Sequence, residues 1–266
     1  YLAEQFADLK ILRYQIPGWE KLTPKQRLLV YYLNQAGLSG RDIIWDQNYH
    51  HNLRIRRALE TIVLHYTGDK TSADWNAFME YTKRVWFSNG IHHHYSMNKI
   101  IPGFSREYFE SLLASTNQTL SDHVLQSMFD PKVDAKKVNL DPKRDLVMGS
   151  AVNFYGEDVS ESEVDAYYKS IIDKSDETPV SYGLNSKVVR DENGKLTERV
   201  YHLNGLYGPA IKEIIYWLDQ AVTVAENQAQ ADALKLLIEY YKTGDLETWD
   251  AYNIAWVNAT EGDIDY

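Results

Sequence analysis

The chain has 266 residues, of which 44% are hydrophobic and 25% charged, a composition typical of a folded globular protein. Its 38 acidic and 28 basic residues give a formal net charge of −10 at pH 7, and a negative protein repels the phosphate backbone of nucleic acid. It has no cysteine, which excludes disulfides and a thiol nucleophile, and no apolar run of about 18 residues. We therefore expect neither nucleic acid nor a membrane among its partners.

Capping signals and apolar stripes predict helices along most of the chain. Thr23-Pro24-Lys25-Gln26 combines an N-cap threonine, a proline in the first turn and a glutamine three residues after the cap, and predicts a helix that ends at Gly37. Ser160-Glu161-Ser162-Glu163 is a second capping box. Other helices are predicted over about 52–66, 72–89, 105–113, 160–171, 209–222, 234–243 and 246–256.

A smaller part of the chain reads as β-structure. Ser186–Arg190 and Leu196–Tyr201 flank Asn193-Gly194, a turn that accepts positive φ, so they predict a β-hairpin. Val152–Tyr155 predicts another short strand. The fold class expected is mostly α (α+β), a multi-helical lobe with a small β element. The polar stretch 131–144 contains no periodic stripe and is the best candidate for an internal boundary.

The motifs that would carry catalysis are absent from the sequence. None of the eight histidines is followed by glutamate, so neither HExxH nor HExxxH occurs, and a zinc-peptidase helix needs that glutamate to activate water. There is also no GxSxG elbow and no glycine-rich phosphate loop. We therefore predict no catalytic residue and no metal ligand in this chain.

The run His92-His93-His94-Tyr95 is the most conspicuous polar cluster, and it follows the turn-forming Ser88-Asn89-Gly90. Neighbouring side chains point in different directions, so at most His92 and His94 could converge on one ion. Three interpretations stay open: a metal site, loop histidines bonded to the backbone or solvent, and contacts to a ligand. We predict Tyr95, His94, His92 and Asn89 as substrate-binding residues.

A second histidine pair, His50-His51, follows Asp46. The helical spacing of Asp46 and His50 would allow a metal pair, but no second pair lies nearby in the sequence. The pair is more typical of a polar helix start.

Several collinear blocks resemble the amino-terminal part of the dipeptidyl-peptidase III family, its bacterial branch in particular. The block from Arg84 to Tyr95 resembles the family's Y-S-N-x-G-N-Y stretch, and Val152–Gly156 resembles its T-Y-F-S-G strand. Further blocks begin at Tyr207-Gly208-Pro209, at Leu246-Glu247-Thr248-Trp249 and at Gly262.

This resemblance implies a zinc exopeptidase of two lobes with a wide cleft, which removes dipeptides from the amino end of short peptides. The family's zinc-binding H-E-x-x-G-H and E-E-C-R-A-E helices do not occur here. The resemblance therefore implies that residues 1–266 are a single amino-terminal lobe, inactive alone, with zinc only in the full-length enzyme. Its partners would be short peptides and the catalytic lobe, and Tyr95 matches an aromatic residue that lines the family's peptide cleft.

An alternative function is a standalone helical binding or scaffold module without catalysis. The first residue is Tyr1 rather than methionine, and the chain stops at Asp263-Ile264-Asp265-Tyr266 without a polar tail, so both ends are compatible with a longer natural chain. Both a cytoplasmic and a periplasmic location fit the sequence.

Overall fold

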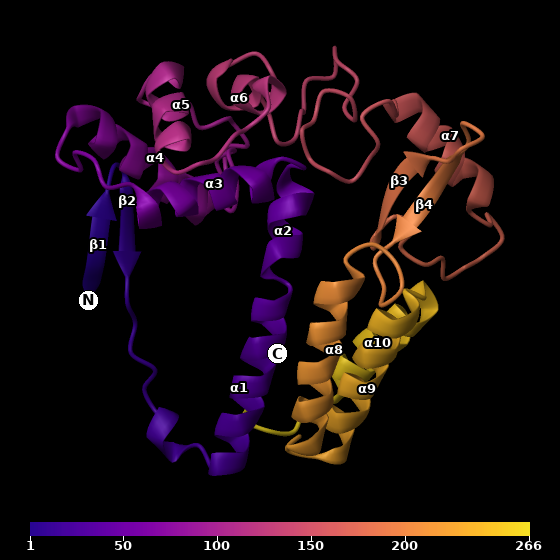
Figure 1. Ribbon diagram of the computed structural model, residues 1–266. Helices are drawn as coiled ribbons and strands as arrows, with labels where there is room; N and C mark the ends of the chain where they lie inside the picture. The colour runs from indigo at the N-terminus through magenta and orange to yellow at the C-terminus, as the bar shows by residue number, and fades with distance from the viewer. The chain divides into compact units, whose positions relative to one another are not determined.

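The computed structural model describes residues 1–266 and shows a chain of short helices with two small sheets (Figure 1). It contains two compact units. Unit 1 comprises Tyr1–Gln15 and Ile44–Asn153, and unit 2 comprises Ile16–Ile43 and Phe154–Tyr266. The stretch 131–144 lies inside unit 1. The prediction of a mostly α-helical fold with a small β element is confirmed.

Unit 1 combines an amino-terminal hairpin with a group of helices. The hairpin pairs β1 (Leu2–Phe6) antiparallel with β2 (Leu9–Leu12), and its register shifts near Leu2. The helix α2 (Arg41–Asn48) enters the unit. The remaining helices are α3 (Asn52–His65), α4 (Ala73–Ser88), α5 (Arg106–Ser115) and α6 (Asp122–Phe129).

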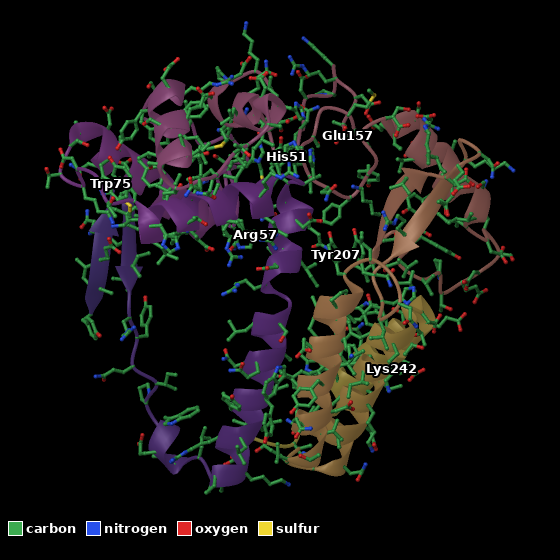
Figure 2. The ribbon with its side chains drawn as sticks, viewed as in Figure 1. His51, Arg57, Trp75, Glu157, Tyr207 and Lys242 are labelled. Atoms are coloured by element: carbon green, nitrogen blue, oxygen red, sulfur yellow. The ribbon has the colours of Figure 1, made fainter.

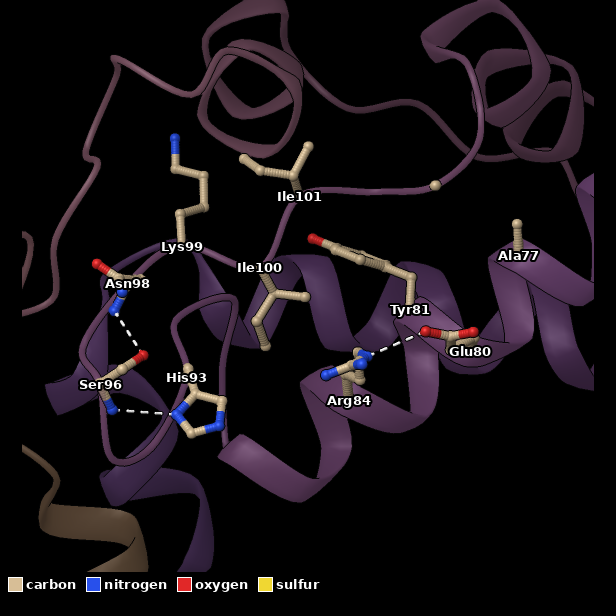
Figure 3. A pocket seen from close by; sticks show the side chains of 11 residues that line it. Ala77, Glu80, Tyr81, Arg84, His93, Ser96, Asn98, Lys99, Ile100 and Ile101 are labelled. Carbon is tan, nitrogen blue, oxygen red and sulfur yellow. Dashed lines mark hydrogen bonds and ion pairs between the residues drawn. The ribbon is translucent and has the colours of Figure 1, made fainter. Parts of the chain in front are cut away.

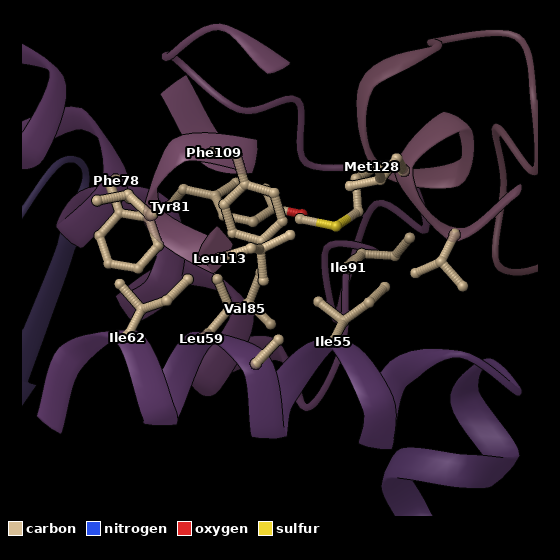
Figure 4. Packing of buried hydrophobic residues seen from close by; sticks show 14 of the residues in the cluster. Ile55, Leu59, Ile62, Phe78, Tyr81, Val85, Ile91, Phe109, Leu113 and Met128 are labelled. Carbon is tan, nitrogen blue, oxygen red and sulfur yellow. The ribbon is translucent and has the colours of Figure 1, made fainter. Parts of the chain in front are cut away.

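The core of unit 1 lies between α3, α4, α5 and α6 (Figure 4). Leu59 and Ile62 project from α3 toward Phe78 and Val85 of α4, and Phe109 of α5 packs on the same cluster; all five are 0% exposed. Burial of such side chains contributes about 1.5–3 kcal/mol each. This core fixes the carboxyl end of α4, from which the loop 91–100 extends.

Unit 2 is built on four packed helices. The helix α1 (Pro24–Ser39) packs on α8 (Gly208–Thr223), α8 packs on α9 (Gln228–Thr243), and α9 packs on α10 (Leu246–Asn258). The unit also holds the short 3-10 helix η1 (Trp19–Lys21), α7 (Glu161–Ile171), β3 (Ser186–Arg190) and β4 (Leu196–Val200). Its separate core includes Leu29, Ile211, Ala221 and Leu234.

The helix starts predicted from capping residues are confirmed, whereas α9 begins at Gln228, six residues before the start predicted for it. Thr23 and Gln26 form a reciprocal capping box at the start of α1, and the Oγ atoms of Ser72 and Ser105 accept from backbone N–H groups in the first turns of α4 and α5. At Ser160 the backbone N–H and the hydroxyl both donate to the carboxylate of Glu163. The hairpin is confirmed too, with β3 antiparallel to β4 and Val189 opposite Thr197.

Two other local predictions are wrong. Gly37 does not end α1, which continues to Ser39, because a single glycine weakens a helix without blocking its hydrogen bonds. Val152–Tyr155 forms no strand: only Tyr155 makes an isolated parallel bridge, to Val188 of β3. The sequence analysis did not predict β1, β2, α2 or α6, each of which is eight residues long or shorter. None of the helices is both long and apolar enough to cross a membrane.

Candidate functional site

The predicted site residues lie on a tight loop that follows α4 in unit 1. The backbone of His92 forms an isolated antiparallel β-bridge with that of Lys99. Beside it, the His93 N–H donates to the Asn98 carbonyl (2.7 Å) and the Ile100 N–H donates to the Ile91 carbonyl (2.8 Å). Met97 closes the turn with a φ of 62°. The loop 91–100 is therefore a short hairpin rather than an open segment.

The base of this loop is fixed by the buried side chain of Asn52, the first residue of α3. Its Oδ1 accepts from the Ile91 N–H at 3.1 Å, and its Nδ2 donates to the Trp45 carbonyl at 3.1 Å. Asn89 ends α4 in the left-handed region with a φ of 51°, and Gly90 follows with a φ of 151°. A left-handed residue is a common way to end a helix, and here it turns the chain directly onto Asn52.

Residues 135–137, within the stretch expected to be a surface connection, pair with the loop. The Lys99 N–H donates to the Ala135 carbonyl and the Lys137 N–H to the Met97 carbonyl. On the other side, the N–H groups of Ala151 and Val152 donate to this segment. The stretch is thus tied into unit 1 by its backbone.

His92 points into the protein and is only 2% exposed. Its Nε2 lies 2.7 Å from the carbonyl oxygen of Asp134, so the neutral ring donates from Nε2. Burial lowers the pKa of His92 to about 4, and its buried Nδ1 has no hydrogen-bond partner. The ring of His92 is therefore buried inside unit 1, where its hydrogen bond joins the loop to the backbone of Asp134.

This buried imidazole should make stability depend on pH. Below about pH 6.5, the unfolded chain gains a proton on His92 that the folded protein does not accept until about pH 4. The stabilisation is present above pH 6.5 and is lost as the pH falls toward 4, by up to about 3 kcal/mol at about 1.4 kcal/mol per unit. Urea unfolding from pH 7 to pH 4.5 should therefore show a steeper loss for the natural protein than for His92→Gln, which keeps the donor. Parallel curves would contradict this.

Lys99 and Tyr49 hold the segment after α6 against the loop. Lys99 as a residue is 9% exposed, and its Nζ donates to the carbonyls of Asp130 and Val133. Burial lowers the pKa of this amine. The buried hydroxyl of Tyr49 donates to Asp134 Oδ2 at 2.7 Å. Two side chains thus fix the conformation of residues 130–134.

His94 and Tyr95 face outward. The ring of His94 stacks on His93 with centroids 4.5 Å apart and meets the edge of Phe87. Tyr95 is 86% exposed, and Asn89 is half-buried, with its carbonyl accepting from Asn48 Nδ2. The structure therefore places Tyr95 and His94 on the surface of one loop and turns His92 away from them, so His92 and His94 do not form a pair.

A pocket of about 410 Å³ lies beside the loop, between it and α4 (Figure 3). His93 lines it and accepts from the Ser96 N–H at 3.0 Å. Tyr81 also lines it; its buried hydroxyl has no hydrogen-bond partner, and burial raises its pKa, so it stays a neutral donor. Arg84 is paired with Glu80 and Asp8. The pocket therefore offers polar and aromatic contacts, and the guanidinium of Arg84 at its wall is already neutralised by two carboxylates.

The structure brings together three histidines that the sequence did not connect: His50, His51 and His123, here called the histidine cluster. Asp46, which has helical spacing with His50 in the sequence, accepts a hydrogen bond at Oδ2 from Asn153 Nδ2 at 3.0 Å. Only the adjacency of His50 and His51 was visible in the sequence, since His123 comes from a helix that was not predicted.

Comparisons with known proteins point to one family. Residues 175–265 match the model described as Peptidase family M49. The structure of DPP III from Caldithrix abyssi matches with a TM-score of 0.58 and 17% identity, over 92% of this chain and 35% of that one. Dipeptidyl-peptidase III from Corallococcus sp. strain EGB matches with a TM-score of 0.58 and 16% identity, over 94% and 35%. No curated protein sequence matches.

This chain is similar in fold to both solved structures, and it spans 35% of the length of each. The M49 match covers the carboxyl-terminal part, from the approach to β3 through α10. The blocks that suggested the family from the sequence extend over both units. The resemblance to the dipeptidyl-peptidase III family is thus confirmed: residues 175–265 carry the sequence pattern of peptidase family M49, and the chain has the fold of part of a dipeptidyl-peptidase III.

Proposed function

We propose that this chain is the peptide-binding, amino-terminal lobe of a zinc-dependent dipeptidyl-peptidase III that removes dipeptides from the amino end of short peptides. The observation that carries the proposal is the M49 match over residues 175–265. It is supported by the fold match over 92% of this chain but 35% of the Caldithrix abyssi structure. In this proposal residues 1–266 form one lobe, and the catalytic lobe is its partner.

The residues present do not fit the family's zinc site. No histidine is followed by glutamate, so the base that would activate water beside a zinc ligand is missing. The histidine cluster also differs, since its members come from the starts of α3 and α6 rather than from one helix face. We therefore assign no catalytic residue here and expect the chain alone to be inactive.

The peptide contacts proposed for this lobe are Tyr95, His94 and Asn89, with His92 holding their loop from within. An exposed tyrosine ring offers an apolar face and a hydroxyl, a combination that suits binding of peptide side chains.

The test is an assay on a dipeptidyl arylamide. We expect no cleavage by residues 1–266, with or without added zinc, and chelator-sensitive cleavage by the full-length gene product. In the full-length enzyme, Tyr95→Ala should raise KM more than it lowers kcat, while Tyr1→Ala, also exposed, should change neither. Zinc-dependent cleavage by residues 1–266 alone would contradict the proposal, and an inactive full-length product would favour a binding module.

A further inference from the structure

The histidine cluster joins two separate parts of unit 1. His50 and His51 lie between the end of α2 at Asn48 and the start of α3 at Asn52, and Figure 2 shows His51 at this corner. His123 lies in the first turn of α6. One ring nitrogen from each histidine lies within 4.8 Å of the other two.

The spacing of these nitrogens is close to that of metal ligands. The Nε2 atoms of His50 and His51 are 3.0 Å apart, and the His51 and His123 ring centroids are 5.1 Å apart. Two imidazoles bound to one tetrahedral zinc ion, each at about 2.0–2.1 Å, have nitrogens about 3.3 Å apart. A cation can therefore replace the proton between His50 and His51 with a shift of a few tenths of an ångström, while His123 moves further.

A buried tyrosine holds two of the rings in place. Tyr49 is 1% exposed, and its ring centroid lies 4.7 Å from that of His50 and 5.3 Å from that of His51. The Tyr49 hydroxyl is itself fixed by Asp134. Because these side chains are already ordered, binding an ion loses little side-chain entropy.

Some of the charges around the cluster favour the binding of a cation and others oppose it. Burial, then the neighbouring His50, His123 and Arg54, lowers the pKa of His51 to about 4, so its ring nitrogen carries no competing proton at neutral pH. Arg54 and the amino ends of α3 and α6 oppose a cation, whereas Asp134 attracts it. His50 and His51 are half-buried and His123 is exposed, which leaves the cluster open to solvent.

We propose that His50, His51 and His123 bind one first-row transition-metal ion, with zinc as the biological candidate. Imidazole suits such ions, and three protein ligands leave a fourth position for water. The bound ion would tie the corner between α2 and α3 to the start of α6. This inference stands apart from the proposed peptidase activity, since it needs neither the catalytic lobe nor its zinc.

The test is calorimetric titration of zinc chloride at pH 7.5 into residues 1–266 carrying no histidine tag. We expect one site, weakened about 100-fold or more in His51→Ala and in His123→Gln, since even changes outside the ligand set cost 10–100-fold. His123 is exposed, so His123→Gln leaves the fold intact and keeps the test valid if His51→Ala unfolds. His65→Ala on α3 and His94→Ala on the loop serve as matched controls and should bind as the natural chain does.

A second readout identifies the geometry. Cobalt(II) should give the intense visible absorption of a tetrahedral site in the natural chain and in His65→Ala, and lose it in His123→Gln. Unchanged zinc affinity in His123→Gln would overturn the proposal. Loss of binding in His94→Ala alone would overturn it as well, by locating the ion at the 92–94 run. Absence of any heat or absorption in the natural chain would have the same effect.

Discussion

Phe78→Ala should lower the free energy of unfolding of unit 1 by about 3–5 kcal/mol, the usual cost of removing a buried aromatic ring. Phe78 is 0% exposed, and its ring lies 5.2 Å from that of Trp75, 5.7 Å from Phe104 and 6.4 Å from Phe109. These neighbours come from α4, the segment before α5, and α5 itself. They cannot close the gap without moving two helices, so a cavity remains.

Urea unfolding measures this loss, and hydrogen exchange followed by mass spectrometry assigns it to α3 and α4 rather than to unit 2. Leu64→Ala is the matched control. Leu64 lies on α3 but is 74% exposed, so its loss should cost less than about 0.5 kcal/mol. A similar loss of stability in both variants, or faster exchange confined to unit 2, would be inconsistent with the core described for unit 1.

The helix starts were predictable because their signals are local. At Thr23, Ser72, Ser105 and Ser160, a side-chain oxygen and its partner lie within three residues of each other in the sequence. Such contacts depend little on the rest of the chain. The turn at Asn193-Gly194 is similar, because two residues determine its backbone conformation.

The elements that were missed depend on partners distant in sequence. The hairpin β1–β2 has largely exposed strands, so it lacks the alternation of apolar and polar residues that marks a half-buried sheet. It is tied to α4 by ion pairs from Lys83 to Glu4 and from Arg84 to Asp8. Neither pair can be inferred from the residues of the hairpin itself.

The loop position of the proposed site residues after a helix end was predictable, but the directions of their side chains were not. The sequence treated His92 and His94 as equivalent members of one run. The structure separates them because the carbonyl of Asp134, 42 residues further along, accepts from His92 inside unit 1. The histidine cluster escaped notice for the same reason, since His123 reaches His51 only through the packing of α6.

Gly90→Ala should destabilise unit 1 by about 3 kcal/mol or more. Its φ of 151° is a conformation that residues with a Cβ rarely adopt, at a cost of about 1–3 kcal/mol. An added Cβ would also overlap the side-chain amide of Asn52 and lie 2.8 Å from its Cγ. Asn52 is 1% exposed and bonds both Ile91 and Trp45, so displacing it leaves buried polar groups unpaired, at about 1–3 kcal/mol each.

Two other glycines separate these contributions, with urea unfolding as the measurement in all three variants. Gly194 has a φ of 77° but nothing within 4 Å of an added Cβ, so Gly194→Ala should show the backbone cost alone, about 1–2 kcal/mol. Gly37 lies inside α1 with open space around it, so Gly37→Ala should stabilise the protein by about 0.5–1 kcal/mol. If Gly90→Ala cost no more than Gly194→Ala, Asn52 could not be what fixes the site loop, because its displacement would then carry no penalty.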